Sequence, residues 1–249
     1  MQPFVVQLFD LTLIQLTNWR WSWRSSVIVG AVFPVFSIVA FGIFAADSGP
    51  ETLGYVLTGN MVFALLMEGV GKVSSNFSYM RSNGAFVYFA SLPIYRSALI
   101  VATALAFLLL SLPATAVTLL MGGLILHLPL NVSPWLVIVI PLICVSLSGL
   151  GALLGLVGQT PEQVNSFSLL VSIFLFGFGP VLIPPDRLPP IINTLSVFSP
   201  ATYAASALRQ TILGVPDRLP LAVDMLVLGG IAVGLLALVN RQVVWRDQA

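Results

Sequence analysis

The chain has 249 residues, of which 58% are apolar and only 8% are charged, and its formal net charge is +1. A soluble globular domain carries about a quarter charged residues, so this composition excludes an ordinary soluble fold. The sequence also lacks a long basic run, which is the electrostatic footprint that nucleic-acid binding requires. We therefore expect a membrane protein with lipid, and not nucleic acid, as a partner.

The apolar residues fall into blocks of about 20, the length that a helix needs to cross roughly 30 Å of hydrocarbon. These blocks predict an all-α integral membrane fold with six transmembrane helices in a single domain, residues 1–249. A positively charged start before the first block loosely resembles a signal sequence, but the block is too long and begins too late, so we expect an uncleaved first span. The predicted spans are Val27–Ala46, Leu53–Val73, Ser97–Leu126, Pro134–Val157, Phe167–Ile183 and Leu221–Asn240.

Charge asymmetry predicts the orientation of these spans. With a cytoplasmic N-terminus, the inner side would receive most of the cations: Arg20, Arg24, Lys72, Arg81, Arg96, Arg241 and Arg246. The outer side would receive Arg187, Arg209 and Arg218, together with the acidic loop that holds Asp47 and Glu51. This distribution obeys the positive-inside rule. We expect a multi-pass protein of the plasma membrane, and specifically of a prokaryotic inner membrane, with both termini in the cytoplasm.

Residues 1–26 precede the first span and are too polar to cross a bilayer. Apolar and polar side chains alternate irregularly there: Phe4, Leu8, Leu11 and Leu16 with Gln7, Asp10, Gln15 and Asn18. Three tryptophans then alternate with two arginines: Trp19, Trp21 and Trp23 with Arg20 and Arg24. Such side chains favour a helix lying in the membrane interface at headgroup depth. A basic-aromatic strip for nucleic acid is the alternative, but two cations are too few.

Two connections between the spans have apolar character. Residues 79–96 form a predicted cytoplasmic loop in which Phe86, Phe89 and Leu92 recur at a helical spacing of three, so this face should seek a partner. Residues 184–220 begin with a proline-rich turn and continue through a predicted helix, Ala201–Leu213, that ends at Gly214. The apolar composition of this segment predicts a helix that dips into the membrane from outside, between spans five and six.

Polar and small residues inside the spans have two interpretations each. Glu68 and Lys72 are four residues apart, as in a helical ion pair, while an intramembrane carboxylate can also be a proton or cation site. In the fourth span, small residues share one helix face: Cys144, Ser148, Gly151 and Gly155. This pattern, like Gly230 with Gly234 in the last span, predicts close helix packing, either internal or between subunits.

Motifs for catalysis, nucleotides or metal ions are missing from the sequence. Gly71 and Lys72 look like the end of a phosphate loop, but Leu66 stands where its first glycine belongs and Val73 where Ser or Thr would bind magnesium. His127 is the one histidine and Cys144 the one cysteine, which argues against a metal site. We therefore expect neither an enzyme nor a cofactor bound by this chain.

Two stretches resemble the type-two ATP-binding-cassette exporter permeases, a superfamily that includes antibiotic-resistance, polysaccharide-export and sodium-efflux permeases. The cytoplasmic loop is similar to that family's ATPase-docking helix and its flanks through Arg81, Gly84, Leu92, Pro93 and Arg96. It lacks the acidic residue that many members have beside the basic one near Arg81. The outer segment is similar to the family's Pro-x-Thr-Tyr, Ala-Leu-Arg and terminal Gly pattern through Ser199, Pro200, Thr202, Tyr203, Ala207, Leu208, Arg209 and Gly214.

The resemblance implies a permease that pairs with a second permease, as a homodimer or heterodimer, and with soluble ABC ATPase subunits. ATP and magnesium would bind on those ATPases. The permease would export a hydrophobic, amphipathic or polymeric substrate by alternating access. An ATP-independent carrier that uses Glu68, or a structural assembly subunit, is the alternative. For Arg209 two roles are open: a cation reaching the outer headgroups, or a gate residue held by a helix-end carbonyl or by a carboxylate such as Asp224.

Overall fold

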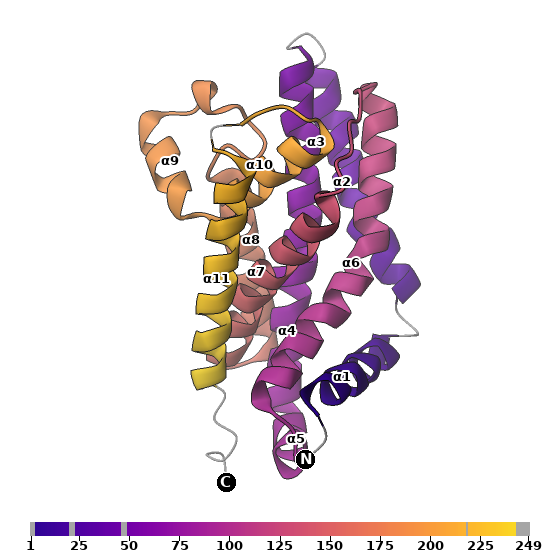
Figure 1. The fold of residues 1–249 in the computed structure, drawn as a ribbon, viewed down its shortest axis with the longest axis vertical. Coiled ribbons are helices and arrows are strands. Elements are labelled where there is room, and N and C mark those ends of the chain that lie inside the picture. Colours follow the sequence, from indigo (N-terminus) through magenta and orange to yellow (C-terminus); the bar gives the residue numbers. More distant parts are fainter. Residues whose placement is uncertain (1–2, 20–22, 46–48, 218, 243–249) are drawn as a thin grey trace.

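The computed structural model describes residues 3–19, 23–45, 49–217 and 219–242, and every regular element in them is helical. Figure 1 shows most of these helices running side by side along the length of the molecule. Their bounds are α1 (Phe4–Trp19), α2 (Trp23–Ala45), α3 (Pro50–Leu66), η2 (Met67–Lys72), α4 (Val73–Ser82), α5 (Ala85–Ser91), α6 (Arg96–Leu126), α7 (Leu136–Val157), α8 (Pro161–Gly177), η3 (Pro185–Arg187), α9 (Pro190–Leu195), η4 (Ser196–Phe198), α10 (Pro200–Ile212) and α11 (Leu221–Gln242).

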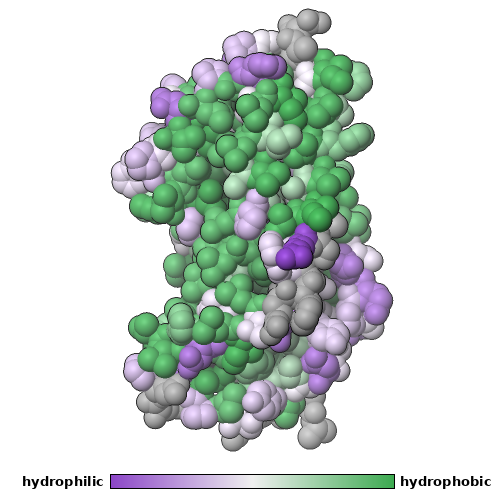
Figure 2. All heavy atoms as spheres, turned by 90° about the vertical axis from the view of Figure 1, so that its right-hand side faces the viewer, coloured by the Kyte–Doolittle hydropathy of each residue, from purple (hydrophilic) through white to green (hydrophobic). Residues whose placement is uncertain are grey.

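Five helices in the described residues are long and apolar enough to cross a membrane. They are Ser26–Phe44, Pro50–Ser82, Ser97–Leu126, Leu136–Val157 and Leu221–Gln242. The space-filling view in Figure 2 shows a largely apolar surface over the upper and middle parts of this face, with hydrophilic residues along its top edge and among the residues of its lower half. This is the surface that a bilayer requires, and it agrees with a multi-pass membrane protein.

The predicted fifth span, Phe167–Ile183, is placed wrongly in the sequence. Its helix, α8, begins at Pro161 because Thr160 caps it: the Thr160 hydroxyl accepts a hydrogen bond from the Gln163 amide at 3.2 Å. The helix ends at Gly177, before Gly179, whose φ of +143° is incompatible with a helix. Seventeen residues make a helix of about 26 Å. The sixth crossing therefore stays a prediction.

The second span is longer than its predicted range, Leu53–Val73. One continuous helix runs from Pro50 to Ser82 and contains the π-helical turn η2, so the first residues of the predicted loop 79–96 still belong to a helix. The helix ends where Gly84 adopts a left-handed φ of +74°. No breaker stands between Val73 and this glycine, which explains the extension.

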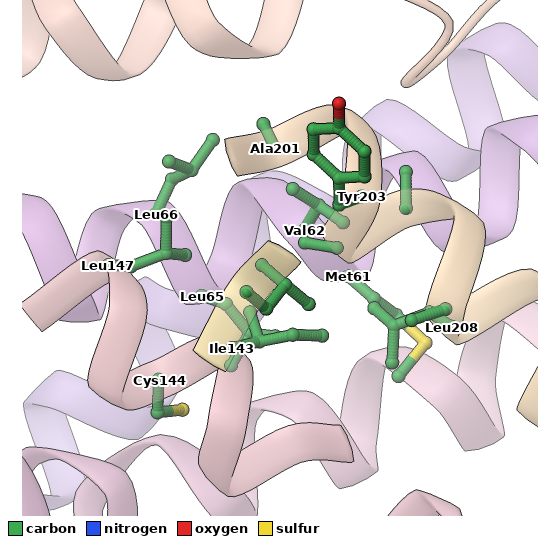
Figure 3. Packing of buried hydrophobic residues seen from close by; sticks show 14 of the residues in the cluster. Met61, Val62, Leu65, Leu66, Ile143, Cys144, Leu147, Ala201, Tyr203 and Leu208 are labelled. Atoms are coloured by element: carbon green, nitrogen blue, oxygen red, sulfur yellow. The ribbon is translucent and has the colours of Figure 1, made fainter. Parts of the chain in front are cut away.

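The core lies around α3, which is enclosed by α2, α6, α7, α8 and α10. Figure 3 shows Leu65, Ile143 and Leu208, from α3, α7 and α10, pointing into one buried apolar cluster. Helix α10 is thus built into the protein and is not a solvated loop, because nearly all its residues are buried. It contacts α3, α7 and α11.

The small residues of α7 allow a second, closer contact. A Cβ atom added to Gly151 would lie 2.4 Å from the Gly69 carbonyl oxygen, and one added to Gly155 would lie 2.5 Å from the Ser74 carbonyl oxygen. The predicted close packing on this face is internal, between α7 and the helix formed by η2 and α4. By contrast, Cβ atoms at Gly230 and Gly234 of α11 would meet nothing within 4 Å, so internal packing is wrong for that pair.

Helix α1 lies across one end of the bundle in Figure 1 and packs on α6. Its buried face carries Gln7, Leu11 and Gln15, at steps of four, while its exposed face carries apolar side chains such as Phe9 and Leu13. The Gln7 amide donates to the Pro93 carbonyl at 3.3 Å and accepts from the Tyr95 amide at 3.0 Å. This inside-out pattern suits a helix against lipid, although its place in the interface stays a prediction. Arg20 and Trp21 lie outside the described residues.

Candidate functional site

The candidate site has two parts, one at each end of the bundle, and Figure 1 shows both. We call the end that carries α9 and α10 the α10 end, and the end that carries α5 the α5 end. The gate segment 184–220 lies at the α10 end, and the coupling segment 79–96 lies at the α5 end. Because α11 starts beside α10 and runs toward the α5 end, the two parts are joined by long helices.

Local sequence explains how α10 is shaped. Ser199 is extended at the N-cap, and Pro200 occupies the first helical turn, where its missing N–H costs no hydrogen bond. Beyond the C-terminus of α10, Gly214 has a left-handed φ of +66°. A Cβ atom at this position would lie 3.0 Å from the side-chain nitrogen Nδ2 of Asn131. Only glycine satisfies both constraints without strain. The predicted helix, Ala201–Leu213, thus agrees with α10 to one residue at each end.

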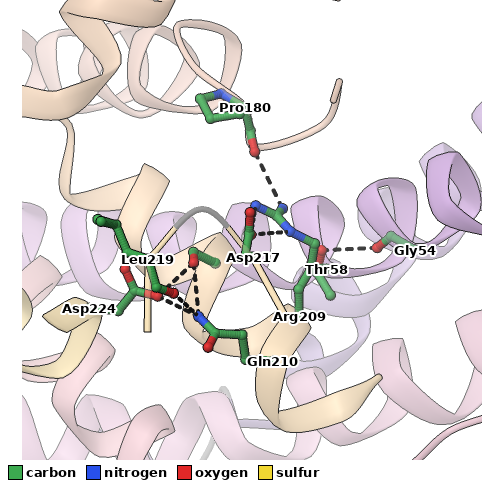
Figure 4. Close-up of polar contacts among 9 residues, drawn as sticks. Gly54, Thr58, Pro180, Arg209, Gln210, Asp217, Leu219 and Asp224 are labelled. Atoms are coloured by element: carbon green, nitrogen blue, oxygen red, sulfur yellow. Dashed lines mark hydrogen bonds and ion pairs between the residues drawn. The ribbon is translucent and has the colours of Figure 1, made fainter. Parts of the chain in front are cut away.

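Arg209 is buried, with 5% of its surface exposed, and it is fully engaged (Figure 4). Its Nε atom donates to Asp217 Oδ2 at 2.8 Å, its Nη2 atom lies 2.6 Å from the same oxygen, and its Nη1 atom donates to the Pro180 carbonyl at 3.3 Å. The guanidinium plane stacks over the Tyr55 ring at 3.9 Å from the ring centroid. A single side chain therefore ties α3, the turn after α8 and the loop after α10 together.

Of the two roles considered for Arg209, this burial excludes a cation that reaches the headgroups. The suggested carboxylate partner, Asp224, is wrong, because Asp217 holds the arginine. Asp224 is fully buried and instead accepts hydrogen bonds from Ser206 at 2.6 Å and from Gln210 at 2.8 Å. Asp224 thereby fastens α11 to the same helix, α10, on a neighbouring turn.

Tyr203 and Thr202 take different positions on α10. The Tyr203 hydroxyl donates to the Val197 carbonyl at 2.7 Å, and burial raises the pKa of this phenol, so it remains a donor at neutral pH. The Thr202 hydroxyl is buried and makes no hydrogen bond within the described residues. The Tyr203 hydroxyl thus holds the short helix η4 against the start of α10.

At the α5 end, the expected docking face is turned inward. Phe89 is only 8% exposed and packs on Leu11, Met80 and Leu99, while Phe86 and Leu92 are partly buried in the same cluster. The prediction that these residues face a partner is therefore wrong for Phe89. The exposed residues of α5 are Val87 and Tyr88, at 64% and 63%. A helical spacing of three identified the apolar face correctly but could not show that α1 and α6 would cover it.

Arg81 makes an internal contact that the sequence did not predict. Its Nη1 atom donates to the Leu156 carbonyl at 2.5 Å, close to the C-terminus of α7. A cation at a helix C-terminus interacts favourably with the helix dipole. Arg81 therefore joins the segment leading into α5 to α7. Pro93 is exposed beyond α5, and Arg96 begins α6, its side chain lying outside the described residues.

Glu68 and Lys72 form the predicted i, i+4 ion pair, and they do so inside the π-helical turn η2. Glu68 is 3% exposed, and its second oxygen, Oε2, makes no hydrogen bond with the described residues. π-Helical turns are rare and frequently mark functional sites. The structure brings this pair to neither the gate segment nor the coupling segment, so its proton or cation role stays a prediction.

Three residues of the site were missed by sequence reasoning: Tyr55, Asp217 and Asn131. Asp217 follows Arg209 by eight residues, across the break at Gly214 and Pro216, and this chain reversal was the available signal for the pair. The other two reach α10 through tertiary packing and carry no local signal.

Comparison of the sequence with known proteins identifies the family of this chain. A sequence model described as ABC-2 type transporter matches residues 7–213, a range that includes the whole coupling segment and the gate segment as far as Leu213. The chain is also similar to a daunorubicin resistance ABC transporter permease protein of Streptomyces coeruleorubidus, with 27% identity over 217 residues that make up 85% of this chain and 70% of the relative. The predicted resemblance is confirmed: the chain belongs to the ABC-2 type transporter family.

Proposed function

We propose that this chain is the membrane permease of an ABC exporter and that a separate ATPase drives it by docking on α5. The observation that carries the proposal is the shape of the α5 end. Val87 and Tyr88 project from a short helix whose opposite face is packed on α1, α4 and α6. A partner that pushes on this helix would move a rigid element, not a flexible loop.

Arg81 supplies a route from the docked ATPase into the bundle. It connects the start of the coupling segment to the end of α7, and α7 packs backbone to backbone against η2 and α4 through Gly151 and Gly155. ATP binding on the partner would favour one of two permease conformations by its differential affinity for them. Alternating access of a hydrophobic, amphipathic or polymeric substrate would follow. Magnesium and ATP belong to the ATPase in this scheme.

The orientation and the second permease complete the proposal. The cation distribution supports an orientation with the α5 end in the cytoplasm of a prokaryotic cell and the α10 end outside. On α11, Gly230 and Gly234 leave open space beside the exposed side chains of Leu226 and Val233. Small residues of this kind let two membrane helices approach closely, so this stripe is a suitable contact for a second permease.

The docking role is tested by a charge on the exposed face of α5. Tyr88→Asp, co-expressed with a candidate ABC ATPase, should lose that ATPase in a pull-down, because an unpaired carboxylate is unfavourable in a packed interface. Ile191→Asp is the matched control, since Ile191 is also well exposed, at 75%, but belongs to α9 at the opposite end. Unchanged recovery of the ATPase with Tyr88→Asp would contradict docking on α5. ATP-independent transport would favour the carrier alternative.

A further inference from the structure

A cavity of about 300 Å³ lies at the α10 end, between α3, the connection from α6 to α7, and the loop after α10. Most of its wall is apolar and comes from six residues of these segments: Pro50, Leu128, Pro129, Leu213, Val215 and Pro216. The volume is at the lower end of the range for small-molecule sites, which are typically apolar with a few converging polar groups. The polar groups here are Glu51, Tyr55, Arg209 and Asp217.

The walls of this cavity are held in place before any ligand arrives. The connection from α6 to α7 is bonded to the end of α10, because the Asn131 amide donates to the Ile212 carbonyl at 2.8 Å and the Ser133 amide donates to the Thr211 carbonyl at 2.7 Å. The Arg209–Asp217 ion pair fixes the loop after α10 against Tyr55 of α3. Proline at three positions of the wall limits backbone freedom further. A ligand would thus meet a largely preformed site.

The charges around the cavity select the sign of the ligand. Among its described lining residues, Arg209 and Asp217 neutralise each other, and Glu51 supplies a second carboxylate at the solvent-exposed edge. At Tyr55 in the cavity wall, the charge of Arg209 is opposed by the carboxylates of Asp217, Glu51 and Asp186. An anion in the cavity would be repelled by this excess of carboxylates, whereas a monovalent cation would be attracted.

We propose that this cavity binds lipophilic organic cations, with the apolar body among the prolines and leucines and the positive charge toward Glu51. Binding of such a cation does not depend on the proposed function. Only the further step, that the bound cation is transported cargo, rests on the proposed exporter function. The bound molecule would touch Arg209 and Asp217, whose ion pair joins the loop after α10 to that helix.

Tetraphenylphosphonium and tetraphenylborate test the proposal, because they have nearly the same shape and opposite charge. Binding of each ion to the purified full chain in phosphatidylcholine nanodiscs would be measured by equilibrium dialysis, with binding to empty nanodiscs subtracted. We expect saturable binding of tetraphenylphosphonium alone. Tetramethylammonium, a cation without the apolar body, should not compete. Equal binding of both tetraphenyl ions, or competition by tetramethylammonium, would overturn the proposal.

Variants of the permease locate the binding site. Glu51→Gln should weaken tetraphenylphosphonium binding by about fivefold at low salt, as expected for loss of an exposed ion pair. Val215→Trp should abolish binding by filling the cavity, and it should fold because Val215 is half exposed. Glu162→Gln is the matched control: Glu162 follows a proline in the first turn of α8, just as Glu51 does in α3, but it lies outside the cavity. Wild-type binding by both Glu51→Gln and Val215→Trp would refute the site.

This experiment separates the inference from the function on which it rests. It uses the permease alone, so it does not depend on docking of an ATPase. If ATPase docking is lost but cation binding is intact, the binding site is supported and the proposed exporter function is refuted. If the ATPase docks but no cation binds, the proposed exporter function is supported and the binding site is refuted.

Discussion

Arg209 Nη2 lies 2.6 Å from Asp217 Oδ2, and this buried ion pair closes the loop after α10 back onto the helix from which it emerges. Burying two charges is unfavourable unless they are paired and hydrogen-bonded, and here the Pro180 carbonyl and the Tyr55 ring engage the remaining parts of the guanidinium. We call this ion pair the clasp, because it holds the loop after α10 against the rest of the gate segment. Substitution of either residue tests what the clasp contributes.

Asp217→Ala should destabilise the folded protein by about 3 to 5 kcal/mol, because Arg209 would be left buried without its carboxylate. The double variant Arg209→Met, Asp217→Ala should recover much of this loss, since neither charge remains. Thermal unfolding of the detergent-purified proteins measures both. The single variant Arg209→Met is measured as well. If the losses of unfolding free energy in the two single variants simply added up in the double variant, the two residues would not be energetically coupled.

Arg209→Lys keeps the positive charge but removes the planar arrangement of donors that serves Asp217 and Pro180 at once. We expect normal expression with loss of export, measured as cellular resistance or efflux at matched protein levels. Arg187→Lys is the matched control, because Arg187 is exposed. Gln210→Glu would not serve as a control, because the Gln210 side chain donates a hydrogen bond to Asp224. Normal export by Arg209→Lys would remove the clasp from the mechanism.

The two glycine pairs should respond differently to added bulk. Gly155→Val places side-chain atoms against the Ser74 carbonyl and Phe77, so it should destabilise the single chain by at least about 1 to 3 kcal/mol. Gly234→Val meets no internal atom and should leave the monomer folded while weakening association of two permeases. Thermal unfolding and cross-linking in membranes measure these effects. A Gly234→Val variant that still dimerises fully would exclude the α11 stripe as the contact.

The predicted orientation needs labelling positions that the structure shows to be accessible. Ser199, a natural choice from the sequence, is buried, so Val197→Cys is preferable because Val197 is half exposed. In a Cys144→Ala background, Val197→Cys should react with an impermeant thiol reagent in intact cells, and Ser82→Cys should react only after lysis. Labelling of Ser82→Cys in intact cells would reverse the topology.

Sequence reasoning reached the elements that have strong local signals. Helix α10 was predicted almost to the residue, because Pro200 and Gly214 mark its ends, and the long apolar helices followed from length and composition. It failed where tertiary packing decides. Phe89 has the same helical spacing whether it faces an ATPase or the chain's own α1 and α6, and the Gly151 and Gly230 patterns look alike although only the first is packed internally. Asp224 was the wrong partner for Arg209 because spacing along the chain cannot distinguish Asp217, in the loop after α10, from Asp224, in the first turn of α11.

If an ATPase docks on α5 as proposed, its nucleotide should change the geometry at the α10 end through Arg81. It is tested most directly by the labelling rate of Val215→Cys, in the Cys144→Ala background, with the ATPase present and with or without a non-hydrolysable ATP analogue. We expect the analogue to change this rate several-fold. Arg81→Ala should abolish the change while the ATPase stays bound, whereas the exposed Arg241→Ala should preserve it. A labelling rate that is the same with and without nucleotide, in a complex that contains the ATPase, would show that nucleotide does not act on the α10 end.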